Sequence, residues 1–321
     1  MEARSSIEAT RALGGRPDPS RPLVASSSRR GEKLIYLLLA LCAVVSVITT
    51  TAIVIALLTP TIGFFQEVPL GDFFSKDTWA PLTADPSFGV FNVLMGTINT
   101  SLWALVVAVP IGLFSAIYLS EYARPRVRKV VKPILEILAG IPTVALGVFA
   151  VTFLSPEIQK VFPEFIKTPP FAAGVAGLAI GLMIVPIIAS ISDDAMRSVP
   201  GGLREGAYAL GATKLKVSTR VVFPAAISGV VASIVLAGSR AVGETMIVLL
   251  AAGATANFTL DPGESVLTMT AFIGRTATGD VATGTTAYDT IFAVGSLLFV
   301  ITFVLNIFAI RLVRRFREVY E

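Results

Sequence analysis

Long apolar runs restrict what this sequence can fold into more than any other feature. The first extends from Leu34 to Leu58 without a charged residue, and a helix needs only about 20 apolar residues to cross the hydrocarbon core of a bilayer. Similar runs follow at about residues 95–119, 133–154, 171–191, 222–252 and 290–312. Because only helices and closed barrels satisfy their backbone in lipid, the sequence predicts an all-α polytopic membrane protein with six transmembrane helices.

Composition supports this class. Of the 321 residues, 54% are hydrophobic and only 15% are charged, whereas soluble domains contain about 25% charged residues. The single cysteine, Cys42, cannot form an intrachain disulfide or a Cys-based metal site, and the sequence contains no histidine, so no metal site is expected. Residues 1–33, rich in Arg, Ser, Pro and Gly, are expected to form a disordered basic tail ahead of a membrane domain at residues 34–321.

The distribution of positive charge predicts the topology. Most of the 26 Lys and Arg residues lie in the N-terminal tail, the 120–132 turn, the 193–220 loop and the C-terminal tail. The three opposite loops contain only Lys76, Lys160, Lys167 and Arg275. By the positive-inside rule, both termini and the 193–220 loop are expected in the cytoplasm. The basic pI is therefore explained by topology, and no nucleic-acid partner is needed.

A polar segment at residues 200–224, PGGLREGAYALGATKLKVSTRVVFP, interrupts this apolar chain. Good helix formers predict a short helix from Leu203 to Leu210, which Gly211 can end in a left-handed conformation. Such a helix is too short to be stable alone in water, so a neighbouring protein surface is expected to hold it.

The spacing within this segment resembles the EAA loop of ABC-importer permeases. The residues that carry the likeness are Glu205-Gly206-Ala207, Gly211 and Pro224. Gly206 departs from the usual Ala, and Val221 and Phe223 depart from the usual Ile and Leu. The resemblance implies a cytoplasmic coupling helix that fits a cleft on a separate ATPase subunit, whereas the alternative is an ordinary basic loop.

One cation, Arg240, lies inside a predicted span, with Glu244 one helical turn further on the same expected helix face. A central Arg costs about 2.5–3.5 kcal/mol on insertion scales, so it is expected to face protein or water. Two interpretations remain open. The residues can form a structural ion pair, or Arg240 can bind a passing oxyanion through its planar donors while Glu244 prevents binding from becoming too tight.

Three local features add expectations for the other spans. Asn99 and Thr100 open the second span; close helix packing is the favoured interpretation, and lining of a substrate pathway is the other. Pro142 predicts a kink in the third span. Ser192, Asp193 and Asp194 are expected to cap a helix that begins the 193–220 loop.

The run Gly238-Ser239-Arg240-Ala241-Val242-Gly243-Glu244-Thr245-Met246 is similar to the GRAxGETM segment of PstC-type permease subunits of phosphate ABC importers. The likeness extends from about residue 34 to the C-terminus. Further matching segments are Phe73-Phe74, Trp79-Ala80-Pro81, Phe88-Gly89, Gly96-Thr97, Thr100-Ser101, Ser120-Glu121-Tyr122, Ala139-Gly140-Ile141-Pro142-Thr143 and Ile188-Ala189-Ser190-Ile191-Ser192.

This resemblance implies a location in a prokaryotic plasma (inner) membrane and a set of partners. A PstA-type permease would complete the pore, a PstB-type ATPase dimer would bind the coupling helices, and a PstS-type protein would deliver phosphate. Arg240 and Glu244 match charged positions that the family uses in phosphate passage.

The chain is not expected to be an enzyme or to bind a cofactor. Gly206 and Gly211 have the glycine spacing of an ATP-binding GxxxxGK[ST] loop, but Ala212-Thr213 follows where Lys-Ser/Thr is needed. ATP would therefore be used by the partner ATPase.

The alternatives are a permease for another oxyanion such as sulfate, molybdate or phosphonate, and an ATPase-independent secondary transporter or channel. An intramembrane enzyme is disfavoured, because no catalytic spacing is present.

Overall fold

The computed structural model describes residues 30–316, with side chains from Glu32 to Leu312. Most of the predicted basic tail lies outside the described residues, and the first helix already begins at Arg30. The chain divides into two compact units, Met1–Val54 and Ile55–Glu321. The described part of the first unit is the beginning of helix α2, whose side chains between Glu32 and Val54 are nearly all exposed.

The described part of the chain is mostly helical. Its elements are α2 (Arg30–Glu67), α3 (Leu70–Phe73), β1 (Trp79–Ala80), β2 (Ser87–Phe88), α4 (Phe91–Ile117), the π-helical turn η1 (Tyr118–Tyr122), α5 (Pro125–Ala139), α6 (Thr143–Phe149), η2 (Ala150–Leu154), α7 (Ser155–Val161), α8 (Ala173–Arg197), α9 (Gly201–Ala209), α10 (Lys214–Val217), η3 (Ser218–Val222), α11 (Phe223–Ala225), α12 (Ile227–Val242), α13 (Met246–Ala251), α14 (Met269–Thr278) and α15 (Thr286–Phe316). Strands β1 and β2 form an antiparallel pair.

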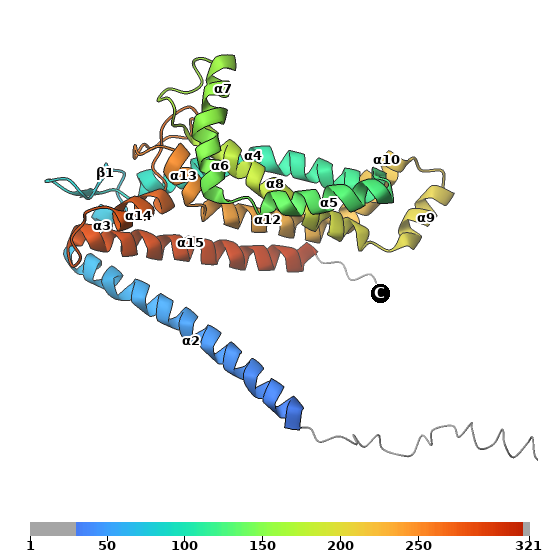
Figure 1. Ribbon diagram of the computed structural model, residues 1–321, viewed down its shortest axis with the longest axis horizontal. Coiled ribbons are helices and arrows are strands. Elements are labelled where there is room, and N and C mark those ends of the chain that lie inside the picture. The colour runs from blue at the N-terminus through green and yellow to red at the C-terminus, as the bar shows by residue number, and fades with distance from the viewer. Residues whose placement is uncertain (1–29, 317–321) are drawn as a thin grey trace, which may run out of the picture. The chain divides into compact units, whose positions relative to one another are not determined.

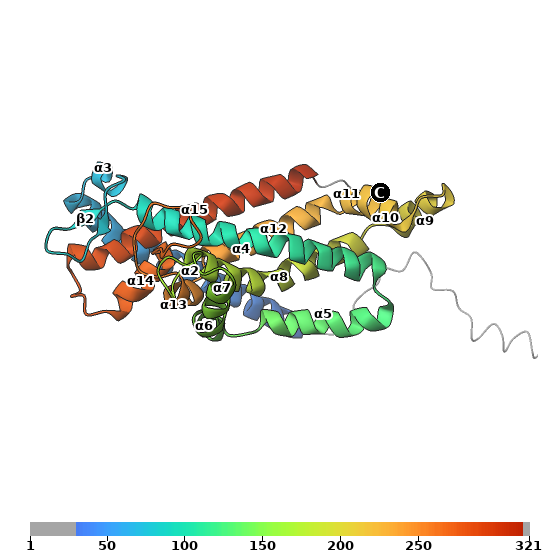
Figure 2. The ribbon, with the colours of Figure 1, turned by 90° about the horizontal axis from the view of Figure 1, so that it is seen from above.

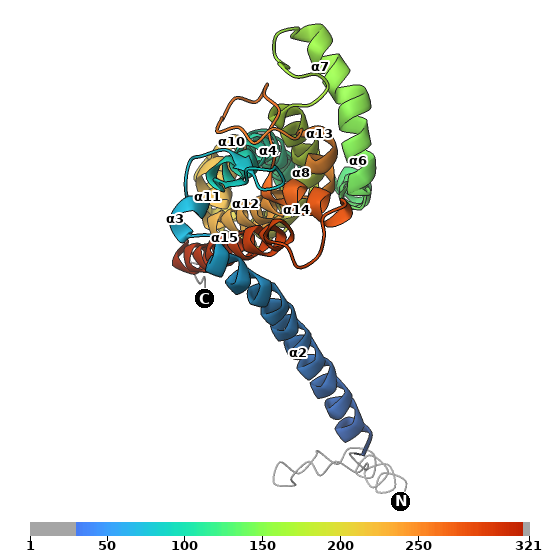
Figure 3. The same ribbon diagram turned by 90° about the vertical axis from the view of Figure 1, so that its left-hand side faces the viewer.

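In the second unit, α4, α8, α12 and α15 lie alongside one another as a bundle (Figure 1). One end of this bundle carries α9 and α10 and is called the α9 end; the other carries β1, β2 and α14 and is called the β1 end (Figure 2). Viewed along the bundle, α6 and α7 extend to one side of it (Figure 3). Within the second unit, α6 and α7 therefore lie outside the central helix group formed by α4, α8, α12 and α15.

The number of spans agrees with the prediction. Among the described residues, five helical segments are long and apolar enough to cross a membrane, and a bent pair, Lys214–Ala225 with Ile227–Val242, makes up to six. The two helices of this pair meet at 71°. The chain is a multi-pass membrane protein.

Small residues let α4 and α8 approach closely, as the sequence predicts. A Cβ added to Gly177 of α8 would lie 2.7 Å from Cβ of Trp103 on α4, and one added to Gly112 of α4 would lie 2.8 Å from Cβ of Ile188 on α8. Contacts this short leave no room for a larger side chain. The α4–α8 pair is consequently the tightly packed centre of the molecule.

The third span differs from the prediction. Residues 133–139 belong to α5, which ends at Ala139 with Gly140 as its C-cap, and α6 begins only after Pro142. The chain breaks there rather than kinks, because proline lacks the N–H that would continue the α5 ladder but fits just before the first turn of a new helix. The two parts then diverge: α5 runs along the bundle, and α6 with α7 runs across it (Figures 1 and 2).

Helix α8 also differs, since it continues through Ser192, Asp193 and Asp194 to Arg197. The expected capping role of these three residues is therefore wrong. Asp193 is fully buried, and its Oδ2 accepts a hydrogen bond from Nη2 of Arg128 at 2.7 Å. Asp194 pairs with Lys132 at 2.5 Å. These acidic residues tie α8 to the basic face of α5 instead of starting a helix.

We predict that Gly177→Val destabilises the chain by about 1–3 kcal/mol, because its side chain would overlap Trp103 and force α4 and α8 apart. The measurement is the midpoint of thermal unfolding in detergent micelles. Gly63→Val is the matched control, since no atom lies within 4 Å of a Cβ added at Gly63. Equal midpoints for the two variants would contradict the packing described here.

Candidate functional site

Arg240 lies on the last turn of α12 and on the helix face that the bundle leaves free. Helix α12 packs against α8, α15 and α4 through the buried stripe Ser233, Ala237 and Ala241. Leu236 and Arg240 lie on another stripe, and both are exposed. Among the residues that the structure describes, the Arg240 guanidinium has no hydrogen-bond or ion-pair partner. This chain therefore presents an uncompensated positive charge from within its fifth span.

Glu244 does not share a helix with Arg240. Helix α12 ends at Val242, Gly243 follows as its C-cap, and α13 begins at Met246. The buried Glu244 carboxylate accepts hydrogen bonds from the N–H groups of Met246 at 3.0 Å and Ile247 at 3.2 Å. It thus caps α13, where the helix dipole also favours a negative charge.

The predicted ion pair on one continuous helix face is therefore wrong, although both residues lie in the same span. The cause is local: Gly243 ends one helix, and Glu244 satisfies the free N–H groups of the next. A glycine followed by an acidic residue and a further apolar run is a stop-and-restart signal that sequence inspection could have used.

Asn99 and Thr100 are both buried in this chain, and their part in a substrate pathway stays a prediction. Nδ2 of Asn99 donates to the carbonyls of Thr259 and Asp261, each at 3.1 Å. The Thr100 hydroxyl donates to carbonyls of its own helix, at Gly96 and Thr97. The geometry gives both residues the packing role that the sequence favoured: Asn99 fixes the loop after α13 to α4.

The predicted coupling segment forms the short helix α9, which begins at Gly201, two residues before its predicted start. Gly211 has a φ of 77°, so the predicted left-handed ending is confirmed. Glu205, Gly206 and Pro224 are exposed. Ala207 is half-buried and packs against the cluster that includes Met196, Val199 and Val217. Its small side chain lets α9 lie close to the bundle.

Several apolar side chains at the α9 end are exposed in the described part of the chain. Leu210, at the C-terminal end of α9, is 90% exposed, and Leu215 is 64% exposed. Leu203 and Tyr208 on α9 are also exposed. Exposed apolar residues grouped on a short helix are typical of a protein-binding surface.

Sequence analysis missed the contact that holds α9 in place. Nη2 of Arg204 lies 3.0 Å from Oε1 of Glu121, which belongs to η1 at the end of α4. The pair is separated by 83 residues, so no local pattern reveals it. The matching segment Ser120-Glu121-Tyr122 was the only available signal.

An ion cluster at the β1 end joins two loops. Nζ of Lys167 lies 2.5 Å from Oδ2 of Asp261 and 3.2 Å from Oε1 of Glu264. The Lys167 hydrogen bond and the Gly263 N–H lower the pKa of Asp261 below its usual 3.8. Hydrogen bonds to Asp261 and Glu264 raise the pKa of Lys167 above 10.5. The cluster holds the loop after α13 over the start of α8, where the N–H of Ala173 donates to the carbonyl of Glu264 at 2.8 Å.

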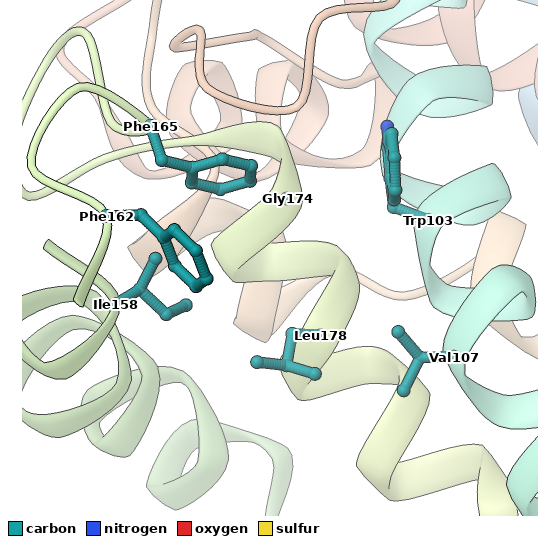
Figure 4. Close-up of a pocket in the computed structure, with 7 residues that line it drawn as sticks. All are labelled: Trp103, Val107, Ile158, Phe162, Phe165, Gly174 and Leu178. Atoms are coloured by element: carbon teal, nitrogen blue, oxygen red, sulfur yellow. The ribbon is translucent and has the colours of Figure 1, made fainter.

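A cavity of about 380 Å³ lies between α4, α7, α8 and the 162–172 loop. Its lining is almost entirely apolar (Figure 4): Trp103, Val107, Ile158, Phe162, Phe165, Gly174 and Leu178. No charged side chain lines it, so it does not suit an anion. Among the described residues, no group of three acidic or cysteine side chains could hold a metal ion either.

The bundle and the exposed α9 segment are those of a membrane transport permease. Residues 108–318 match the model of the family described as binding-protein-dependent transport system inner membrane component, and the chain belongs to this family.

Two relatives and one solved structure illustrate the likeness. The probable ABC transporter permease protein YqgH of Bacillus subtilis is 33% identical over 264 residues, which cover 82% of this chain and 84% of the relative. The phosphate transport system permease protein PstC of Mesorhizobium japonicum is 32% identical over 252 residues, 73% of this chain and 75% of the relative. The structure of a bacterial ABC transporter involved in the import of the acidic polysaccharide alginate superimposes with a TM-score of 0.65, at 18% identity over 90% of this chain and 98% of that chain; it supports the fold alone.

We predict that Lys167→Gln raises the pKa of Asp261 and accelerates hydrogen exchange at the amides of Ala173 and Gly174. In the native chain the Asp261 contribution is present above pH 3.8 and is lost as the pH falls through the lowered pKa, whereas the Lys167 contribution is lost only as the pH rises through its raised pKa. NMR titration and hydrogen exchange measure the two effects. Lys160→Gln is the control, because Lys160 pairs only with Glu157 on its own helix; an equal effect from both variants would rule out the cluster as the tie.

Proposed function

We propose that this protein is the permease subunit of an ATP-driven phosphate importer and forms half of the translocation pathway. The observation that carries the proposal is the exposed and unpaired Arg240 on α12. Its sequence context matches PstC-type chains, and PstC of Mesorhizobium japonicum is a relative over most of the chain.

Arg240 suits the passage of an oxyanion. A guanidinium stays charged at any physiological pH and presents planar donors that match the oxygens of phosphate. Because no carboxylate of the described chain neutralises Arg240, its charge is available to an anion. A charge exposed toward lipid would be costly, so the α12 stripe with Leu236 and Arg240 faces a second permease subunit across a water-filled pathway.

The second subunit is of the PstA type. Such permeases are related to this chain, since PstA 1 of Mycobacterium tuberculosis is 37% identical over 175 residues, 54% of each chain. The ATPase is a PstB-type dimer that binds α9, and a PstS-type binding protein brings phosphate to the β1 end. ATP is used by the ATPase and not by this chain, which has no phosphate-binding loop. The α9 end and both termini lie in the cytoplasm, as the positive-inside rule indicates.

The transport cycle depends on a change in the contact between the ATPase dimer and α9. The nucleotide-bound ATPase dimer contacts α9 differently from the nucleotide-free one, and this difference biases the permease between an inward-open and an outward-open state. The alternative is a permease for another oxyanion, because a guanidinium alone does not select phosphate over sulfate. Competition by unlabelled sulfate for labelled phosphate uptake distinguishes the two.

We predict that Arg240→Gln abolishes phosphate uptake by the complex reconstituted in proteoliposomes, while the subunits still assemble. The neutral side chain keeps polar donors but loses the charge that draws the anion into a low-dielectric pathway. Arg311→Gln, at another exposed arginine with no described partner, is the matched control and should transport normally. Normal uptake by Arg240→Gln would remove Arg240 from the pathway.

We predict that Leu210→Asp breaks docking of the ATPase, since it places a charge on the most exposed apolar side chain of the α9 end. The permease itself should keep its thermal stability, because Leu210 makes little contact within the chain. Co-purification of the ATPase with tagged permease measures docking. Leu82→Asp is the control, at a half-exposed leucine of the β1 end, and full recovery of the ATPase with Leu210→Asp would reject α9 as the docking element.

A further inference from the structure

Helix α9 is attached to the bundle by very few side chains. Of its residues and its C-cap, only Arg204 and Ala207 are even half-buried, and none is fully buried. A force applied to α9 by a docked partner passes through these side chains as well as through the short backbone links to α8 and α10. Ala207 contributes a single methyl group, so Arg204 is the main side-chain connection.

The Arg204 guanidinium bonds to two different helices at once. Its Nη1 donates to the carbonyl of Val199 at 2.7 Å, and its Nη2 donates to the carbonyl of Met196 at 2.7 Å. Met196 is in the last turn of α8 and Val199 follows the end of that helix by two residues, a place where free acceptors and the helix dipole favour a cation. The same Nη2 reaches Glu121 of η1, at the end of α4, at 3.0 Å.

The Glu121 carboxylate is shielded from water and held in one orientation. The Glu121 side chain is only 5% exposed, and that of Arg204 is 21% exposed, so water screens the pair weakly. Oε1 of Glu121 also accepts a hydrogen bond from the Ser120 hydroxyl at 3.0 Å, which fixes its orientation. A second contact joins the same two regions: Nζ of Lys214 on α10 lies 4.9 Å from the ring centre of Tyr122.

We propose that Arg204 and Glu121 form the joint that transmits movement of α9 to α4 and α8 together. These two helices are the most closely packed pair in the molecule, so a displacement delivered to both moves the centre of the bundle as one body. Arg204 is a positioning residue: it contacts neither substrate nor ATP. The inference rests on the proposed function, because it concerns how α9 couples a docked ATPase to transport.

The test uses the complete reconstituted complex and measures two quantities. These are the phosphate transported per ATP hydrolysed and the amount of ATPase that co-purifies. In Glu121→Gln the joint loses its charge while Arg204 keeps its bonds to the α8 carbonyls, and in Arg204→Gln all three bonds are disrupted. We expect the ATPase to co-purify with both variants, and the amount of phosphate transported per ATP hydrolysed to fall about tenfold, because one partner of a shielded ion pair is removed. The conservative variant Arg204→Lys, which keeps a positive charge that can pair with Glu121 and donate to these carbonyls, should retain part of the native ratio. Arg197→Gln, at an exposed arginine with no described partner near the end of α8, should keep the native ratio.

Two results would overturn the inference. A phosphate-to-ATP ratio within twofold of the native value in both single variants would show that the pair transmits nothing. Loss of ATPase from Glu121→Gln would make the residue a requirement for docking and not for transmission. Failure of the proposed function would give different results. The native complex would not transport phosphate, or Leu210→Asp would leave binding of the ATPase intact.

Discussion

An unpaired guanidinium within a membrane-spanning helix is the constraint on which the rest of this structure depends. A charge at that depth costs several kcal/mol unless protein or water surrounds it, and Arg240 finds no partner among the described residues of its own chain. The proposed function therefore places a second subunit opposite the exposed stripe of α12. On the other side of α12, small buried residues fix the helix against α8 and α4, so the guanidinium is presented from a rigid support.

The helix break at Gly243 separates the Arg240 charge from Glu244. On one continuous helix, Arg240 and Glu244 would lie a turn apart and could neutralise each other. In the structure the Glu244 carboxylate is occupied by the N–H groups that begin α13. The two charges thus have different roles: Glu244 caps a helix, and Arg240 is the group that the proposed function assigns to the anion. The same break turns α13 away and lets the loop after it fold back over the start of α8.

The two ends of the bundle are held together by different interactions. At the β1 end, the loops are tied down by Lys167, Asp261 and Asn99, which closes the backbone over the helix ends. At the α9 end, apolar side chains such as Leu210 are exposed, and Arg204 is the main side-chain attachment of the helix that carries them. In the proposed complex, movement of a docked partner would reach the bundle through this attachment.

Local sequence patterns predicted those features of the fold that depend on neighbouring residues alone. Apolar run length predicted the number of spans, and Gly211 predicted the end of the coupling helix. The failures were of two kinds. Periodicity does not distinguish a kink from a full break, so the separation of α5 from α6 at Pro142 and the ending of α12 at Gly243 were missed. Contacts between distant residues, such as Arg128 with Asp193 and Arg204 with Glu121, depend on the tertiary fold and leave no pattern in one sequence.

Water access to position 240 in the assembled complex tests the central claim most directly. The chain has one cysteine, Cys42, so Arg240→Cys in a Cys42→Ser background gives a single thiol for labelling. If α12 lines an anion pathway, a charged, water-soluble thiol reagent reacts at this position and phosphate slows the reaction. Labelling only by a lipid-soluble maleimide, with no effect of phosphate, would place the residue against lipid and contradict the account.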